Sequence, residues 1–224
     1  MNIKMNKPEI IILCAAHINS PERAKLFYKM LHTQMCQSHL CHVYVSVSGL
    51  PVTFEFNFHV QKYIKIYHQP EPKLSQFTHY HRLINTLFDN GIIKPNTYIL
   101  FADDDDEMHS ERNKIYYNHL CEQNTNGNKI DVLHLRDSII RCEKNHCGEL
   151  YELHKSDNEY VAFCVSGIVA KMLINCLTPN SVLEYTCDVT FMYLLMAWPW
   201  SNVTEYATYP VYYYMYSMFL AKGY

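Results

Sequence analysis

The sequence has little glycine and little charge. Only 6 of its 224 residues are glycine, and no linker or internal repeat divides the chain, so we expect a single domain over residues 1–224. Charged residues make up 18% of the chain and apolar residues 49%, a balance that excludes a disordered protein. The formal net charge of −3 provides no positive field for a phosphate backbone, so nucleic acid is not an expected partner.

The sequence also lacks a hydrophobic run of membrane-spanning length. The apolar stretches Val161–Ala170 and Phe191–Trp198 are much shorter than the ~20 residues that cross a bilayer. The apolar string after Pro8 is short and runs into His17 and Asn19, as a first strand would and a signal peptide would not. We therefore expect no membrane span and a cytoplasmic protein.

Nine cysteines are present, but no CxxC pair and no disulfide framework can be recognised. Several lie in apolar strings, where a thiol packs as a small hydrophobic group, and this indicates a reducing compartment. Two Cys/His clusters, at Cys36–His42 and Cys142–Cys147, leave a zinc site as an alternative. Neither has the ligand spacing of a structural zinc finger.

Strands alternate with helices over the first 120 residues, which predicts an α/β fold with a doubly wound, mostly parallel sheet. The second half is mixed. The strands expected from apolar runs are Glu9–Ala16, His42–Ser48, Val60–Tyr67, Thr97–Ala102, Val132–Leu135, Val161–Val165 and Tyr209–Tyr216, with a possible hairpin before Asp157. The expected helices begin at Ser20, Lys73, Ser110, Ile168 and Asp188.

Four consecutive aspartates, Asp103–Asp106, directly follow the apolar string Tyr98–Ala102. A run of like charges is commonly a solvated loop, but ligands of parallel sheets bind beyond the carboxyl ends of the strands, where this run begins. In an extended chain, alternate side chains face the same side, which pairs Asp103 with Asp105. Such a pair suits Mg²⁺ or Mn²⁺, which leaves coordination positions for water and for the phosphates of a substrate.

The two common glycine-rich phosphate-binding motifs are missing. No GxxxxGK[ST] occurs, which excludes a P-loop, and no GxGxxG follows the first strand, which argues against a nicotinamide or flavin cofactor. We therefore expect any diphosphate to be held mainly through the metal ion.

Two strings carry a resemblance to a known family. Tyr98–Arg112 (YILFADDDDEMHSER) resembles the strand, acidic turn and helix start of the GT-A nucleotide-sugar glycosyltransferases, whose so-called DxD motif ends a central strand. Leu74–Leu83 (LSQFTHYHRL) is similar to the helix before that strand in small GT-A domains of chloroviruses and other large DNA viruses. The resemblance implies a GT-A (Rossmann-like) fold, with a nucleotide-binding half at 1–122 and an acceptor-side half at 123–224. For a viral protein, the compartment would be the host cytoplasm.

The same resemblance implies a reaction and its site. A sugar would move from a nucleotide diphosphate donor, a UDP-sugar in the first instance, to a glycan or other hydroxyl acceptor, with Mn²⁺ or Mg²⁺ as cofactor. Asp105 would be the primary metal ligand, and Asp103 would lie beside it, near the ribose. Asp106 would be the alternative metal ligand if the family motif is aligned in a different register. The residues expected around the nucleotide are Ala15, His17, Asn19, Ser48, His79, Arg82, Asp103 and Asp104.

Asp188 is the candidate general base, because it opens an apolar helix at a place similar to the family's catalytic acidic position. Helix N-capping is the alternative role for this residue. Ser166–Gly167 resembles a turn that brings the backbone close to the donor sugar, or it serves only the turn itself. Two other functions stay open for the whole chain: a metal-dependent phosphohydrolase or nucleotidyltransferase, and a catalytically silent carbohydrate-binding domain.

Overall fold

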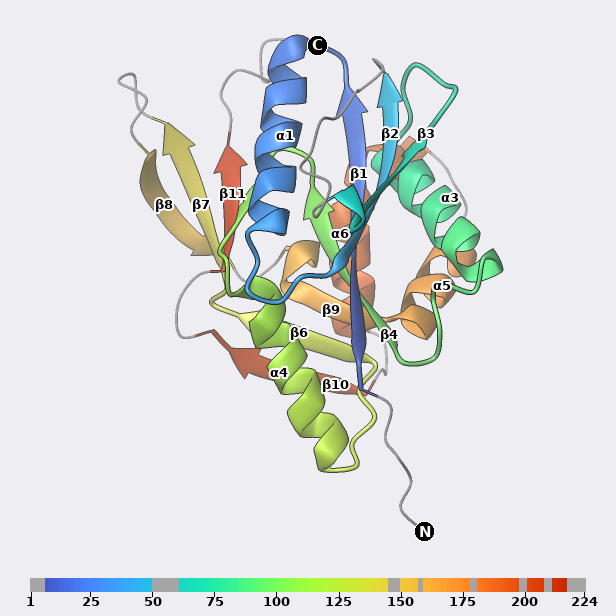
Figure 1. Ribbon diagram of the computed structural model, residues 1–224, viewed down its shortest axis with the longest axis vertical. Coiled ribbons are helices and arrows are strands. Elements are labelled where there is room, and N and C mark those ends of the chain that lie inside the picture. The colour runs from blue at the N-terminus through green and yellow to red at the C-terminus, as the bar shows by residue number, and fades with distance from the viewer. Residues whose placement is uncertain are drawn as a thin grey trace.

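A computed structural model describes residues 7–49, 61–144, 150–156, 159–177, 181–197, 201–207 and 211–216. Its centre is a seven-stranded sheet, with a four-stranded sheet beside it (Figure 1). The central sheet has the strand order β10 (Asn202–Tyr206), β6 (Val132–Arg136), β9 (Phe163–Ser166), β4 (Thr97–Asp103), β1 (Glu9–Ile18), β2 (His42–Gly49) and β3 (Ile64–His68). The smaller sheet has the order β5 (Glu107–Met108), β11 (Tyr212–Tyr216), β7 (Ile139–Lys144) and β8 (Leu150–Ser156).

The central sheet is mostly parallel, as the alternation of strands and helices predicts. β4, β1, β2 and β3 run parallel to one another, and β9 is antiparallel to both of its neighbours, β4 and β6. Strands β1 and β4 are almost completely buried, which explains their continuous apolar runs. The mixed α/β fold expected from the sequence is confirmed.

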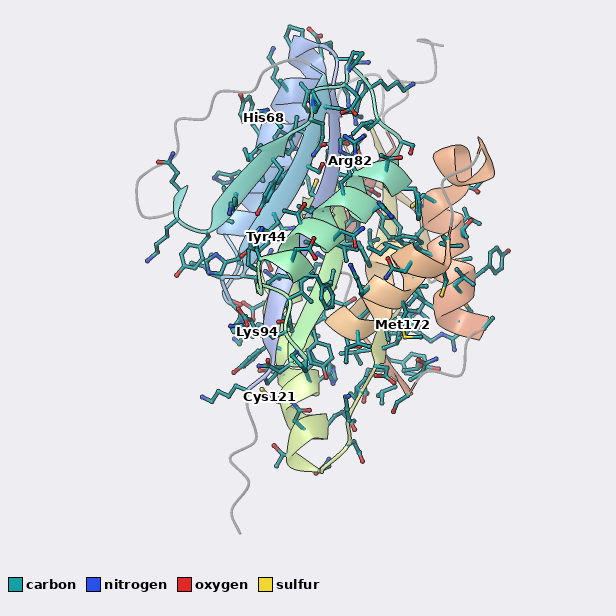
Figure 2. The ribbon with its side chains drawn as sticks, turned by 90° about the vertical axis from the view of Figure 1, so that its right-hand side faces the viewer. Tyr44, His68, Arg82, Lys94, Cys121 and Met172 are labelled. Carbon is teal, nitrogen blue, oxygen red and sulfur yellow. The ribbon has the colours of Figure 1, made fainter. Side chains whose placement is uncertain are left out.

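Helices cover both faces of the central sheet. α1 (Pro21–Met35) and α4 (Arg112–Thr125) lie on one face, while α3 (Gln76–Asp89), α5 (Gly167–Cys176) and α6 (Ser181–Ala197) pack together on the other (Figures 1 and 2). Serine side chains cap α1, α3 and α5 by accepting a hydrogen bond from the backbone of the first turn. Within the described residues, no helix has the length and apolar character needed to cross a membrane.

The observed elements differ from the sequence-based expectations at several boundaries. β3 begins at Ile64, because the chain turns at residues 61–63, and α3 begins at Gln76, after its cap Ser75. The hairpin expected before Asp157 is formed by β7 and β8. β5 and β10 were not expected: β5 has only two residues, and β10 lies at an edge, where one parallel neighbour suffices to hold it.

Candidate functional site

Three neighbouring parallel strands end at the same edge of the central sheet. Asp103 at the end of β4 lies beside Ala15 of β1, and Ala15 lies beside Ser46 of β2. Two residues further on, His17 pairs with Ser48. This register brings the acidic run to the edge where ligands of open α/β sheets bind.

A cleft of about 420 Å³ lies at this edge. It contains six of the residues expected from the sequence to bind nucleotide or metal, together with the candidate base Asp188. Its lining consists of Ala15, Ala16, His17, Arg23, Leu74, Gln76, His79, Asp103, Asp104, Asp105 and Asp188. The strongest polar groups are therefore four carboxylates, one guanidinium and two imidazoles.

Asp103 is held by groups from both halves of the chain. Its carboxylate accepts hydrogen bonds from Gln76 Nε2 at 2.8 Å and from the Tyr160 hydroxyl, and its backbone N–H donates to the Tyr212 hydroxyl at 3.1 Å. Burial raises the pKa of Asp103 to about 8, and the neighbouring carboxylates, including Asp188, add to the rise. A negative charge on Asp103 is thus poorly compensated by the protein alone.

Arg23 is the cation closest to the acidic turn in the described structure. Its two terminal nitrogens donate separately, Nη2 to Asp104 Oδ1 at 2.5 Å and Nη1 to Asp105 Oδ2 at 2.7 Å. Asp104 also accepts from the His17 backbone N–H at 3.1 Å. Burial still raises the pKa of Asp104 to about 6 against the opposing effect of Arg23.

The sequence analysis missed Arg23, although a signal for it exists. Arg23 follows its N-cap Ser20 by three residues, and its backbone N–H donates to the Ser20 hydroxyl at 3.2 Å. The first turn of a helix disfavours a cation because of the helix dipole. A basic residue there indicates an acidic partner, and this partner is the aspartate turn.

The acidic run does not stay extended, contrary to the alternation predicted for it. β4 ends at Asp103, and Asp104 and Asp105 form a turn, so Asp103, Asp104 and Asp105 all line the cleft. Asp106 is buried elsewhere and accepts a hydrogen bond from the Tyr212 hydroxyl at 2.8 Å. The structure therefore brings Asp105, and not Asp106, to the cleft beside Asp103.

A chain of neutral polar side chains lies behind the cleft. His17 Nδ1 is 3.0 Å from Ser48 Oγ, and Ser48 Oγ is 3.0 Å from His79 Nε2. His79 Nδ1 is in turn 2.8 Å from Ser46 Oγ. Burial lowers the pKa of His79 to about 4, and burial also lowers the pKa of His17, so both rings are neutral at pH 7.

Three of the expected nucleotide-binding residues are not in the cleft lining. Arg82, labelled on α3 in Figure 2, forms a two-pronged ion pair with Glu71 at 2.7 and 2.8 Å and donates to Gln69 Oε1 at 3.0 Å. Asn19 is exposed beyond the end of β1. Ser48 is buried, and its hydroxyl oxygen contacts the cleft residues His17, His79 and Leu74.

Asp188, from α6, also lines the cleft. It lies two residues after Thr186, whose φ of −132° and ψ of 26° interrupt α6. The break places Asp188 in the first turn of the second helical segment, a position compatible with either role predicted for it. The charge on Asp188 contributes to the raised pKa of Asp103, so the two carboxylates share one electrostatic environment.

The Ser166–Gly167 turn lies at the wrong end of the sheet to approach a donor sugar there. Because β9 is antiparallel to β4, Ser166 pairs with Tyr98 near the start of β4, and Asp103 lies at its other end. The Ser166 side chain caps α5, and a Cβ added at Gly167 would lie 2.3 Å from Ile93 Cγ2. The glycine therefore serves the turn itself, the alternative stated above, because a side chain there would clash with Ile93.

No group of three or more His, Cys, Asp or Glu side chains is arranged as a metal cage in the part of the chain that the structure describes. The Cys36–His42 segment therefore forms no zinc site. In the second Cys/His cluster, His146 and Cys147 lie outside the described residues.

No protein-family model matches the sequence, and no curated protein matches it. Solved structures do match. Staphylococcus aureus TarS 1–349 in complex with UDP superposes with a TM-score of 0.61 at 11% identity, over 93% of this chain and 61% of that chain. The same protein in complex with UDP-GlcNAc gives a TM-score of 0.61 at 14% identity, over 93% and 59%.

The fold is of the GT-A type. The larger TarS structure agrees, with a TM-score of 0.59 at 13% identity over 92% of this chain and 36% of that chain. The present chain thus spans less than two thirds of each TarS chain it matches. At these identities the likeness establishes the GT-A-like fold alone, and the chemistry has to be argued from the cleft.

Proposed function

We propose that the chain is a glycosyltransferase that takes a nucleotide diphosphate sugar as donor and a hydroxyl group as acceptor. One observation carries this proposal: Asp103, Asp104 and Asp105 line a cleft at the carboxyl ends of β1, β2 and β4, with Asp188 in the same lining. The fold supports it, since TarS, which shares that fold, has been crystallised with UDP and with UDP-GlcNAc. A UDP-sugar is accordingly the first donor to test.

The residues present fit a divalent cation. Burial raises the pKa values of Asp103 and Asp104, and neighbouring carboxylates add to the rise, so a further positive charge in the cleft would favour the ionised carboxylates. Carboxylate oxygens are the ligands that Mg²⁺ and Mn²⁺ prefer, and Mg²⁺ needs only one or two of them when a diphosphate supplies the rest. Asp105 and Asp103 are the proposed ligands. A bound ion would neutralise charge on the departing diphosphate.

Arg23 has a second proposed role in donor binding. Its guanidinium lines the cleft and is 15% exposed, while both of its hydrogen bonds to carboxylates come from separate nitrogens. A diphosphate entering the cleft would meet this cation beside the acidic turn. Arg23 then holds Asp104 and Asp105 in place and offers its remaining N–H groups to phosphate oxygens.

Asp188 is the proposed general base that removes the proton of the acceptor hydroxyl. It shares the cleft with the acidic turn, so an acceptor hydroxyl bound in the cleft would lie near its carboxylate. Proton removal during attack at the anomeric carbon is the usual contribution of such a carboxylate. The relationship to enzymes of large DNA viruses stays a prediction from the two sequence strings.

Calorimetry with UDP and UDP-GlcNAc, with and without Mn²⁺, tests the proposal. We expect Mn²⁺ to tighten binding of UDP, and Asp105→Asn to abolish this gain because it removes a charged oxygen ligand. Asp89→Asn, an exposed change on α3, serves as the control that removes the same charge outside the cleft. Asp106→Asn should keep the Mn²⁺ effect, because Asp106 is turned towards Tyr212.

Three results would contradict the proposal or part of it. Binding of UDP and Mn²⁺ by Asp105→Asn as tight as by the parent would eliminate the metal assignment. Release of UMP and sugar 1-phosphate instead of UDP from UDP-GlcNAc would favour the phosphohydrolase alternative, and absence of any nucleotide binding would favour the silent carbohydrate-binding domain.

A further inference from the structure

The hydrogen-bond chain formed by His17, Ser48, His79 and Ser46 continues to the protein surface. Beyond His79 and Ser46, Gln69 Nε2 lies 2.9 Å from Ser46 Oγ, and Arg82 Nη1 lies 3.0 Å from Gln69 Oε1. The chain therefore joins six side chains from β1, β2, α3 and the segment after β3. In order from the surface to the cleft they are Arg82, Gln69, Ser46, His79, Ser48 and His17.

At the outer end of this hydrogen-bond chain the direction of donation is fixed, because the Arg82 guanidinium has N–H donors and no acceptor. Its bond to Gln69 must therefore end on the amide oxygen, which turns the amide nitrogen of Gln69 towards Ser46. The Gln69 amide thus donates to Ser46 Oγ. The ion pair with Glu71 holds Arg82 in this position from the other side.

The fixed direction passes through Ser46 to His79. Ser46 is fully buried, and after accepting from Gln69 its hydroxyl proton finds one acceptor among the described side chains, His79 Nδ1 at 2.8 Å. His79 is neutral and has one ring proton, which must then lie on Nε2. His79 therefore donates to Ser48 Oγ.

The hydrogen bond between Ser48 and His17 is donated in the same direction, towards the cleft. Its oxygen accepts from His79 Nε2 and also from the Leu74 backbone N–H at 3.3 Å, so its own proton is free to go to His17 Nδ1 at 3.0 Å. A neutral His17 with an acceptor at Nδ1 carries its proton on Nε2. The reverse direction would leave the buried Ser46 proton without an acceptor among the described groups, a loss that the forward direction avoids.

We infer that this chain makes His17 Nε2–H a permanent hydrogen-bond donor in the cleft, and that this donor reads a carbonyl oxygen of the nucleobase. The inference rests on the proposed function. His17 lines the cleft together with Leu74 and His79, to which Ser48 joins it, and these uncharged groups offer room for an uncharged ring. Uracil presents a carbonyl oxygen at the 4-position and cytosine an amino group, so a fixed donor favours uracil.

In this arrangement Ser46 and His79 are positioning residues. Arg82 lies outside the cleft and affects binding of the base only through the hydrogen bonds that connect it to His17. Arg82 contacts no ligand but sets the direction of every bond inward from it. His17 is the residue that discriminates between bases.

The tautomers of the two histidines test the direction of the chain without any ligand. Long-range ¹H–¹⁵N correlation spectra of the free protein at pH 7.5 should show the proton on Nε2 in both His17 and His79. Ser46→Ala removes the link that transmits the direction, and both rings should then show mixed tautomers. Ser138→Ala is the matched control, since Ser138 is an equally buried serine whose hydroxyl donates to the Leu135 carbonyl away from the chain. A proton on Nδ1 of either ring in the parent protein would overturn the inference.

Competition between UDP and CDP tests the ligand. We expect the parent protein to bind UDP about tenfold more tightly, the value of one well-formed hydrogen bond, and Ser46→Ala to lose most of this preference. Equal or tighter binding of CDP by the parent would overturn the assignment of His17 as a carbonyl reader. Failure of both nucleotides to bind would overturn the proposed function and with it the ligand, while the tautomers would still decide the direction of the chain.

Discussion

Replacing Asp103 by asparagine should stabilise the metal-free protein, and increasingly so as the pH rises. Burial raises the pKa of Asp103 to about 8, whereas an aspartate in the unfolded chain has a pKa near 3.8. Asparagine has the same shape, and its oxygen can still accept from Gln76 and Tyr160 as Asp103 does. The substitution therefore removes the charge and keeps the contacts.

The magnitude follows from proton linkage. Between the two pKa values the folded protein keeps a proton that the unfolded chain has lost, so the free energy of unfolding falls as the pH rises, by up to ~1.4 kcal/mol per pH unit. From pH 5 to pH 7 the parent should lose about 2.6 kcal/mol through Asp103 alone. Asp104, whose pKa is raised to about 6, acts in the same direction, but it is present in both proteins and cancels in their difference.

Urea unfolding in the presence of EDTA measures the effect. The stability of Asp103→Asn minus that of the parent should widen by about 2.6 kcal/mol between pH 5 and pH 7. Asp89→Asn, at an exposed site, is the control for the removal of one carboxylate outside the cleft. A constant difference for Asp103→Asn would show that its charge is already balanced in the folded state, and a difference that narrows would show that the carboxylate stabilises the fold.

Two further predictions concern the base and the strand end. Asp188→Asn should spare UDP binding and depress sugar transfer by about 10²–10⁴-fold, whereas reduced stability with normal turnover per folded molecule would assign Asp188 to helix capping. Gly49→Ala should lower the free energy of unfolding by about 1–3 kcal/mol more than Gly91→Ala in thermal denaturation. Both glycines have positive φ, but a Cβ at Gly49 would lie 2.2 Å from Ile18 O, while none of the surrounding atoms lies within 4 Å at Gly91, so equal losses would contradict the close approach of β1 and β2.

The sequence predicts the position of the acidic run because that position depends on one strand. Tyr98–Ala102 is continuously apolar, so it has to be buried, and the aspartates begin where it ends. Parallel neighbours then bring Ala15 and His17 to the same edge. The helix start at Ser20 was predicted for a similar reason, since a cap satisfies backbone groups only a few residues away, whereas α3 begins after its cap Ser75 and not at Lys73.

The partners of the aspartates could not be predicted in this way. Gln76 and Tyr160 reach Asp103 from 27 and 57 residues away, and nothing local marks either of them as a polar neighbour. The alternation of an extended chain separated Asp104 from Asp103 and Asp105, but the turn at Asp104 and Asp105 brings all three to the cleft, and Asp106, a candidate ligand by the resemblance, lies outside it. Side-chain direction after a strand end depends on tertiary contacts, here on the Tyr212 hydroxyl, and not on spacing.

Arg82 shows why a helical pattern locates a residue without giving its partner. His79 and Arg82 lie three residues apart on α3, as the predicted helix requires, but only His79 reaches the cleft. Arg82 is longer and extends along the helix to Glu71, which neutralises it at the surface. Its connection to the cleft exists only through hydrogen bonds, which sequence spacing does not encode.

The two polar systems of the cleft meet at a single residue, His17. Its backbone N–H donates to Asp104 Oδ2 at 3.1 Å, while its ring is held by Ser48 at 3.0 Å. Asp104 Oδ1 is bound by Arg23, so the charged end and the neutral end of the cleft are linked through atoms of one strand terminus. Because β1 is buried and paired on both sides, this terminus cannot shift without disturbing β2 and β4. The proposed donor, a nucleotide diphosphate, combines an uncharged base with a charged group, and a strand end held on both sides would present both kinds of partner to it without rearrangement.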